Sequence, residues 1–169
     1  MSNKDTLFYR ENKAVILDFN AEKISSDSGM LLLEKIERKH QIISHFSSFI
    51  IDERNQSYIK HSVDKLLKQR VLMLMQGYED ANDVNLLKDD PVFNEIFDNN
   101  LGSQPTISRF ENSIDKHQIY KLLEAWLDRY ISKLAGRKQV IIDIDGTDAE
   151  TFGKSTTIII QWFLRTYNV

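Results

Sequence analysis

Cysteine is absent from this chain of 169 residues, and proline (two residues) and glycine (six) are scarce. Without cysteine, the chain forms neither a disulfide framework nor a zinc site with thiolate ligands. Scarce proline and glycine leave long helices with few breaks. The start, MSNKDTLFYRENK, is too polar for a signal peptide, and no apolar run approaches membrane-spanning length. We therefore expect a cytoplasmic protein with no membrane partner.

Charge and hydrophobicity set two further limits. The net charge of −3 disfavours a protein wrapped in nucleic acid, although DNA binding needs only a local basic face. Hydrophobic residues make up 41% of the chain and charged residues 28%, which is typical of a globular protein with a real core. The length fits one domain, or one domain and the start of another.

The spacing of apolar residues predicts a mostly helical region that is entered through one short strand. Val15, Leu17 and Phe19 alternate over residues 13–19 and indicate that strand. After Gly136 the pattern returns to period two, which predicts a strand over residues 138–145. Between the two strands, apolar residues three and four apart predict helices within residues 24–40, 41–50, 57–80, 79–97, 102–113 and 115–136.

Three of these helices, those within residues 24–40, 57–80 and 115–136, are predicted to turn an apolar stripe toward the core. Gly77 and Gly136 follow the second and third of them, where a left-handed residue ends a helix. Asp90 precedes Pro91 at the start of another helix. The side chains expected to face the core are Leu32, Leu33 and Ile36; Val63, Leu66, Leu67, Val71 and Leu74; and Ile119, Leu122, Leu123, Trp126, Tyr130 and Leu134.

The stretch SQPTISRFEN, residues 103–112, has the form of a DNA-recognition helix, and it resembles the TVSR helix of lactose-repressor-type repressors. Ser103 caps its start, and Pro105 suits the first turn. Ile107 and Phe110 are spaced to hold the helix on a scaffold. The alternative is a surface helix whose side chains are polar because they are exposed to solvent. The side chains predicted to contact bases and phosphates are Gln104, Thr106, Ser108, Arg109 and Asn112.

A basic stretch upstream, IKHSVDKLLKQR at residues 59–70, adds a second set of candidate DNA contacts. Lys60 and Arg70 are the residues we expect to bind phosphates. The alternative for each residue is the solvated face of an amphipathic helix. The whole candidate edge comprises Lys60, His61, Lys65, Lys68 and Arg70.

Acidic residues gather at the end of the last predicted strand, in VIIDIDGTD. Asp143 and Asp145 are two residues apart and share one face of the strand, and Asp148 follows the turn at Gly146. Carboxylates at a strand end suit Mg²⁺, and two such ions about 3.5–4 Å apart drive phosphodiester chemistry. The alternative is a strand that ends in an ordinary Asp-Gly turn.

Taken in order, these stretches resemble a bacterial insertion-sequence transposase of the DDE type, with a helical N-terminal region and a group-one DDE domain. The segments that carry the resemblance run from about Ser25 to Lys154. They include SSDSGMLLL, GYEDAND, KDDPVF, SQPTISRFEN and IIDIDGTDAETFGK. The combination is specific to the family, whereas DIDGTD alone is not.

The resemblance implies a ribonuclease-H-like domain in which three acidic residues bind two Mg²⁺ ions. In the family, DNA is cut and joined at the terminal inverted repeats of the element. The first family aspartate, which precedes a small residue and threonine, matches Asp145, with Asp143 as the alternative. AETF at residues 149–152 replaces the family's usual DPTH, which leaves the geometry after the strand open.

The expected fold is mainly α. A helical region at residues 1–136 leads into residues 137–155, the first strand and loop of an incomplete ribonuclease-H-like domain. The family's second aspartate and its glutamate belong to later strands. We therefore expect these residues alone to be catalytically inactive.

Residues 156–169 depart from the family, which continues with FNG and aromatic residues. Back-translated with AT-rich codons and read one nucleotide later, this tail gives that continuation, and Trp162 restricts the choice because it has a single codon. We therefore hypothesise a frameshift near residues 154–156, which the coding DNA tests. An out-of-frame apolar segment at residues 158–164 is expected to have no partner strand.

Two alternatives use the same residues differently. A free-standing helix-turn-helix regulator would bind a promoter operator without metal. An all-helical interaction protein would not contact DNA. In the leading interpretation the partner is DNA at the terminal inverted repeats, and a homodimer is left open.

Overall fold

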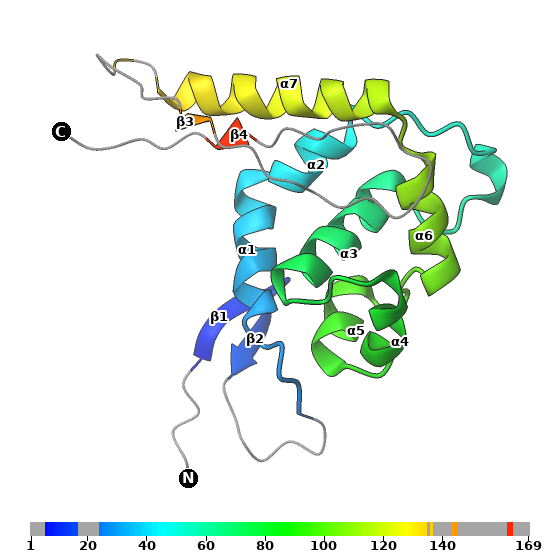
Figure 1. Ribbon diagram of the computed structural model, residues 1–169. Coiled ribbons are helices and arrows are strands. Elements are labelled where there is room, and N and C mark those ends of the chain that lie inside the picture. The colour runs from blue at the N-terminus through cyan, green and yellow to red at the C-terminus, as the bar shows by residue number, and fades with distance from the viewer. Residues whose placement is uncertain (1–5, 17–23, 135, 137–142, 145–161, 164–169) are drawn as a thin grey trace, which may run out of the picture. The chain divides into compact units, whose positions relative to one another are not determined.

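Helices make up most of the computed structural model, which describes residues 6–16, 24–134, 136, 143–144 and 162–163 (Figure 1). The mainly α fold class is confirmed. Residues 1–126 and 127–169 form two units, and each is described by itself. The helices are α1 (Met30–His40), α2 (Ile42–Ser47), α3 (Val63–Met75), α4 (Val84–Leu87), α5 (Pro91–Phe97), α6 (Gln104–Ser113) and α7 (Lys116–Lys133), with short 3-10 turns η1 (Gln56–Tyr58) and η2 (Ala81–Asp83).

A two-stranded antiparallel hairpin precedes the helices. β1 (Thr6–Arg10) pairs with β2 (Lys13–Ile16). Glu11 and Asn12 between them have φ values of 47° and 66°, as a two-residue type I′ turn requires. The strand predicted over residues 13–19 is confirmed at residues 13–16, and residues 17–19 lie outside the described part. Its partner β1 was not predicted.

The core of the first unit joins apolar side chains from α1, α3, α4, α5 and α6. α3 lies between α1 and α6 (Figure 1). Phe93 of α5 is completely buried, stacks on Phe97 and meets the ring of Tyr78 edge-on. The fully buried apolar side chains include Met30, Leu66, Leu72, Met73, Val84, Phe93 and Ile107.

The ends of the helices follow the chemistry predicted for them. Gly77 ends α3 with φ of 89°, a left-handed conformation that glycine adopts without strain. Asp90 caps α5, since its carboxylate accepts hydrogen bonds of 2.9 Å from the backbone N–H groups of Val92 and Phe93. Pro91 occupies the first helical turn. These local signals were sufficient to place both helix ends.

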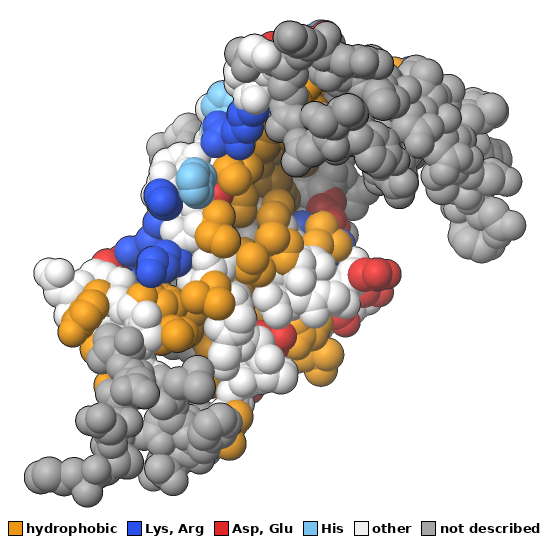
Figure 2. Space-filling view, turned by 90° about the vertical axis from the view of Figure 1, so that its left-hand side faces the viewer, with side chains coloured by type: hydrophobic (Ala, Val, Ile, Leu, Met, Phe, Trp, Pro, Cys, Tyr) orange, Lys and Arg blue, Asp and Glu red, His pale blue; other side chains and the backbone are white. Residues whose placement is uncertain are grey.

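The apolar stripe predicted on α1 is wrong for two of its three residues. Leu33 packs against the core, but Leu32 and Ile36 are 48% and 51% exposed. Figure 2 shows hydrophobic side chains gathered on the side of the molecule that carries α1 and the hairpin. The residues that α1 buries are Met30, Glu34 and Glu37, which are spaced four and three apart on one face.

Both glutamates are buried because each has charged or polar partners. The carboxylate of Glu37 accepts hydrogen bonds of 2.9–3.1 Å from the backbone N–H groups of Ile42, Ile43 and Ser44. It thereby satisfies the free N–H groups at the start of α2, where a negative charge also favours the helix dipole. This glutamate fixes the sharp turn from α1 into α2, at which Gln41 has a positive φ of 50°.

Glu34 is the centre of a buried ionic network. Only 1% of its side chain is exposed, and it faces three cations from three elements. Arg38 lies one turn along α1 at 2.6 Å, Lys68 of α3 at 3.3 Å, and Arg10 of β1 at 3.8 Å. Arg10 continues the network to Glu95 of α5 at 2.7 Å. One carboxylate therefore connects the hairpin, α1 and α3.

The apolar stripe predicted on α3 is also only partly correct. Leu66 is completely buried, and Val63 and Leu67 pack against the core. Leu74, however, is 48% exposed, and the polar side chain of Gln69 is completely buried instead. The buried face of α3 therefore includes Gln69. Its amide can be buried because it has a hydrogen-bond partner in another part of the chain, as described below.

The inward stripe predicted on α7 is wrong for Ile119, Leu123 and Trp126, which are 55%, 41% and 43% exposed. Leu122 packs against the core as predicted. In the first unit, α7 buries Gln118 and Ala125. The side-chain carbonyl of Gln118 accepts a hydrogen bond of 2.9 Å from the backbone N–H of Ile51. Tyr130 and Leu134 of the second unit are half-buried.

In the second unit, β3 (Asp143–Ile144) pairs antiparallel with β4 (Trp162–Phe163). The strand predicted over residues 138–145 is confirmed at residues 143–144, and its other residues lie outside the described part. The expectation that residues 158–164 have no partner strand is wrong for residues 162–163. Within the described ranges, no helix combines the length and apolarity needed to cross a membrane.

The Glu34 network predicts a large stability effect. Glu34→Gln leaves Arg38, Lys68 and Arg10 facing a neutral group, so the free energy of unfolding should fall by about 3 kcal/mol. This is the lower end of the range for a broken buried ion pair, because Arg38 and Lys68 reach solvent and Arg10 keeps its contact with Glu95. Urea unfolding followed by circular dichroism measures this loss. Glu11→Gln removes an exposed carboxylate that also pairs with Arg38, and it should change stability little. Equal effects of the two substitutions would contradict the central role of Glu34.

Candidate nucleic-acid interface

Helix α6 presents a polar surface on a buried apolar base. Ile107 is completely buried and Phe110 is 6% exposed, so the predicted anchoring of the helix is confirmed. Arg109 and Asn112 are exposed, and Ser108 is half-buried. With 3.6 residues per turn, these three side chains lie on the side of α6 opposite its anchors. The helix therefore has one face in the core and one polar face turned outward.

A reciprocal amide pair holds the start of α6 against α3. The side chain of Gln69 donates a hydrogen bond of 3.0 Å to the carbonyl of Gly102 and accepts one of 2.7 Å from its N–H. All of these atoms are buried, so both partners are satisfied without water. A Cβ on Gly102 would lie 2.8 Å from Leu66 Cδ2 and 3.2 Å from Gln69 Oε1. This close approach favours glycine at position 102, two residues before α6 begins.

Ser103 occupies the predicted cap position of α6, but its side chain makes a different contact. Its backbone is extended, with φ of −68° and ψ of 162°. Its hydroxyl pairs with the hydroxyl of Thr106 at 2.9 Å and accepts no backbone N–H in the described chain. The two hydroxyls are therefore held together on one side of the first turn of the helix.

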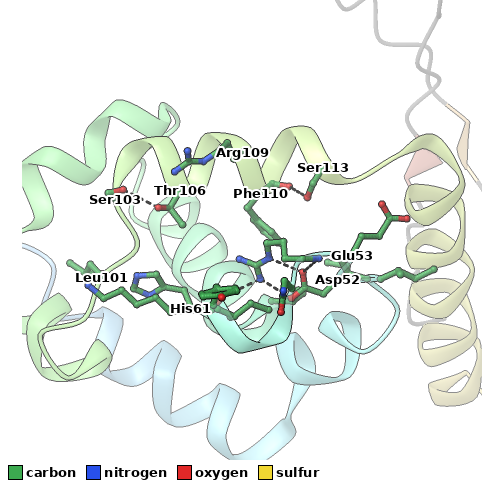
Figure 3. A pocket seen from close by; sticks show the side chains of 17 residues that line it. Asp52, Glu53, His61, Leu101, Ser103, Thr106, Arg109, Phe110 and Ser113 are labelled. Atoms are coloured by element: carbon green, nitrogen blue, oxygen red, sulfur yellow. Dashed lines mark hydrogen bonds and ion pairs between the residues drawn. The ribbon is translucent and has the colours of Figure 1, made fainter.

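A pocket of about 730 Å³ lies between α6 and the segment that connects α2 to α3 (Figure 3). Thr106 and Arg109 line it from α6, and Lys60 lines it from the connecting segment. Three of the predicted DNA-contacting residues are thus brought together. Gln104, Ser108 and Asn112 do not line the pocket, and the amide of Asn112 donates a hydrogen bond of 2.7 Å to the carbonyl of Ser108.

Arg54 also lines the pocket, and sequence reasoning missed it. Its guanidinium forms a two-pronged contact with the carboxylate of Asp52, with distances of 2.7 Å and 2.8 Å. It also donates to the carbonyl of His61 at 3.1 Å. The Arg54 guanidinium lowers the pKa of the Asp52 carboxyl, chiefly through the side-chain hydrogen bond. Arg54 lies in an irregular segment, so no helical or strand spacing identified it.

His61 is a buried polar group in the wall of the same pocket. Its side chain is 7% exposed, and its Nδ1 has no hydrogen-bond partner among the described residues. An unsatisfied buried polar atom costs about 1–3 kcal/mol. Burial lowers the pKa of the imidazole, and the positive charges of Lys65, Lys60 and Arg54 lower it further. Three cations therefore act on this ring.

The other cations of the predicted basic edge are engaged within the fold. Lys65 donates to the carbonyl of Phe97 at 3.3 Å, and Lys68 pairs with Glu34. Arg70 is 12% exposed, pairs with Glu111 of α6 and donates to the carbonyls of residues 78 and 79. Within the described chain, by contrast, neither Lys60 nor Arg109 forms an ion pair.

The acidic strand end lies largely outside the described residues. Asp143 is part of β3, whereas Asp145 and Asp148 fall in the undescribed segment 145–161. Among the described residues, no three His, Asp or Glu side chains gather in a way that could hold a metal ion. The assignment of Asp145 and Asp143 as metal ligands stays a prediction.

Comparison with known protein families matches residues 8–167 to the family described as Transposase DDE domain group 1. The match covers the hairpin from residue 8 onward, the helices, β3, β4 and most of the segment predicted to be out of frame. Searches of curated proteins and of solved structures gave no match. The family resemblance inferred from the sequence is therefore confirmed.

The packing at Gly102 predicts that a side chain at this position lowers stability. Gly102→Ala should lower the free energy of unfolding by about 1–3 kcal/mol, because the added methyl group overlaps Leu66 and the Gln69 amide. Thermal unfolding measures the loss. Gly29→Ala is the matched control, since a Cβ there meets nothing within 4 Å. If both variants unfold at the temperature of the unaltered protein, the close approach at Gly102 is not a constraint.

Proposed function

Because the chain belongs to the transposases with a group 1 DDE domain, we propose that its helical region binds the terminal inverted repeats of a mobile element through α6. The family carries out DNA transposition with divalent metal ions, and its members bind DNA. The regulator alternative would use the same helix, but family membership favours the transposase.

The observation that carries the proposal is the outward face of α6. Arg109 is exposed and forms no ion pair within the described part of the chain, next to Ser108 and Asn112. A guanidinium suits the two acceptors of guanine, and an amide suits adenine. The hydrogen bonds between Gln69 of α3 and Gly102 fix the position of the start of α6 against α3. A rigid helix with a polar outer face is the arrangement that base reading in a major groove requires.

The predicted DNA contacts divide into two groups in this proposal. Arg109 and Thr106 contact the DNA from α6, and Lys60 contacts it from the connecting segment. Arg70 is excluded from the interface because Glu111 and two backbone carbonyls already occupy its guanidinium. Its role is to hold α6 against α3 and the turn after α3.

The catalytic part of the proposal concerns residues 137–155. We propose Asp145 as the first carboxylate of the DDE set, with Asp143 as the alternative, and Mg²⁺ as the divalent ion. Carboxylate oxygens are the ligands that Mg²⁺ prefers. One carboxylate cannot hold two ions across a displacement at phosphorus. A polypeptide of these 169 residues alone should therefore bind element ends without cutting them. The frameshift proposed for residues 156–169 is tested by the coding DNA.

Substitution of Arg109 tests the proposed reading of bases. Arg109→Ala should weaken binding to the inverted-repeat end by roughly 1–3 kcal/mol. Arg109→Lys keeps the charge but loses the two-pronged contact, so it should retain binding to random DNA and lose preference for the end. Fluorescence anisotropy with labelled end and random duplexes measures both effects.

A charge-matched control is Lys39→Ala, which removes an exposed cation from the last turn of α1. It should leave the preference for the end sequence intact. The proposal fails if the unaltered protein binds end and random duplexes equally well.

Metal removal separates DNA binding from the catalytic site. If the helical region alone recognises the ends, adding EDTA at constant ionic strength should leave the affinity for end DNA unchanged. Asp145→Asn should behave in the same way. Gel-shift titration with and without Mg²⁺ tests this point, and a large loss of affinity in EDTA would show that the carboxylates take part in binding.

A further inference from the structure

We propose that the pocket between α6 and residues 52–61 is a phosphate-binding site that receives a backbone phosphate of the DNA bound by α6. The inference rests on the proposed function and adds to it the place where a phosphate binds, the pocket that Lys60 and Arg109 share with His61. It assigns a ligand to a pocket that lies beside the proposed base-reading face.

The charges around the pocket favour an anion. Arg54, Lys60 and Arg109 contribute three cations to its lining, and Asp52 and Glu53 contribute two carboxylates. Asp52 is already neutralised by the two-pronged contact with Arg54. Glu53, Lys60 and Arg109 are all exposed, so solvent screens the three charges alike, and their sum is one positive charge. Lys60 and Arg109 are left as cations without an acidic partner in the described chain.

The pocket also supplies hydrogen-bond donors for phosphate oxygens. The hydroxyls of Ser103 and Thr106 pair at 2.9 Å, so one of them donates to the other and the second is left to donate to a phosphate oxygen. Both residues line the pocket. Figure 3 shows these two side chains and Arg109 along the same part of the helix. Hydroxyls, a guanidinium and an ammonium group are the side chains that most often contact phosphate oxygens in protein–DNA complexes.

His61 is an independent sign that the pocket is built for a ligand. The side chain is more than nine-tenths buried in the pocket wall, yet its Nδ1 has no partner among the described residues. Lys65, Lys60 and Arg54 all act on this ring in the same direction, lowering its pKa in addition to the effect of burial. A phosphate placed among these groups would offset the excess positive charge and raise the pKa of the imidazole.

The position of the pocket indicates that the phosphate is part of a DNA backbone. Thr106 and Arg109 form one wall, and Arg109 also belongs to the outward face of α6 with Ser108 and Asn112. A duplex that meets this face brings its backbone alongside the helix, where Lys60 is exposed. Phosphate contacts of this kind set the register of a protein on DNA without reading sequence.

The test combines NMR with a binding measurement. The chain has four histidines, and His61→Phe identifies the His61 resonance. The pKa of His61 should rise when a duplex carrying the inverted-repeat end is added, whereas His40, His45 and His117 serve as internal references. Lys60→Gln should weaken end and random DNA alike and reduce the slope of log K against log salt by about one. Lys39→Gln, the charge-matched control, should leave that slope unchanged.

Inorganic phosphate alone distinguishes the source of the anion. A rise in the pKa of His61 with DNA, with or without a smaller response to phosphate, supports the inference. A response to phosphate but not to DNA overturns it, because the site would then take a free anion. In another outcome, Arg109→Lys changes the sequence preference while DNA leaves the pKa of His61 unchanged and Lys60→Gln leaves the salt slope unchanged. In that case the phosphate site is overturned and the proposed function stands. No DNA binding at all is instead a failure of the proposed function.

Discussion

The buried carboxylate of Glu34 is the interaction on which the arrangement of the helical unit depends. It faces Arg38 of its own helix, Lys68 of α3 and Arg10 of the hairpin, and almost none of it reaches solvent. A buried charge is tolerated only when such partners surround it. Because the three cations come from three elements, the same charge decides how the hairpin, α1 and α3 lie against one another. The orientation of α1 follows, with its glutamates inside and part of its apolar stripe at the surface.

The position of α3 then determines where α6 lies. Lys68 contacts the Glu34 network, and the next residue, Gln69, binds the backbone of Gly102 just before α6. Two consecutive side chains of one helix thus connect the ionic network to the proposed recognition helix. Arg70, the third, pairs with Glu111 near the end of α6. Three consecutive side chains of α3 therefore fix neighbouring elements, so α6 is held as a rigid surface.

Much of the secondary structure was predictable because its signals are local. Asp90 before Pro91, Gly77 after α3, and the Ser103 start of α6 each lie within one turn of the helix end they mark. The buried faces were less predictable, because apolar spacing assumes that polar residues face water. Glu34 and Gln69 break this assumption, since their partners are supplied by residues elsewhere in the chain.

The sequence by itself determined the helical class, the ends of several helices, the family and the anchoring of α6 by Ile107 and Phe110. Only the tertiary structure decided which cations are available to a ligand and which serve the fold. Arg70 meets a carboxylate 41 residues away, and Arg10 meets one 85 residues away. Such pairs follow from chain folding and leave no periodic pattern. Lys60 and Arg109 meet at one pocket beside the buried His61 for the same physical reason, because long-range packing brings together groups that the sequence keeps apart.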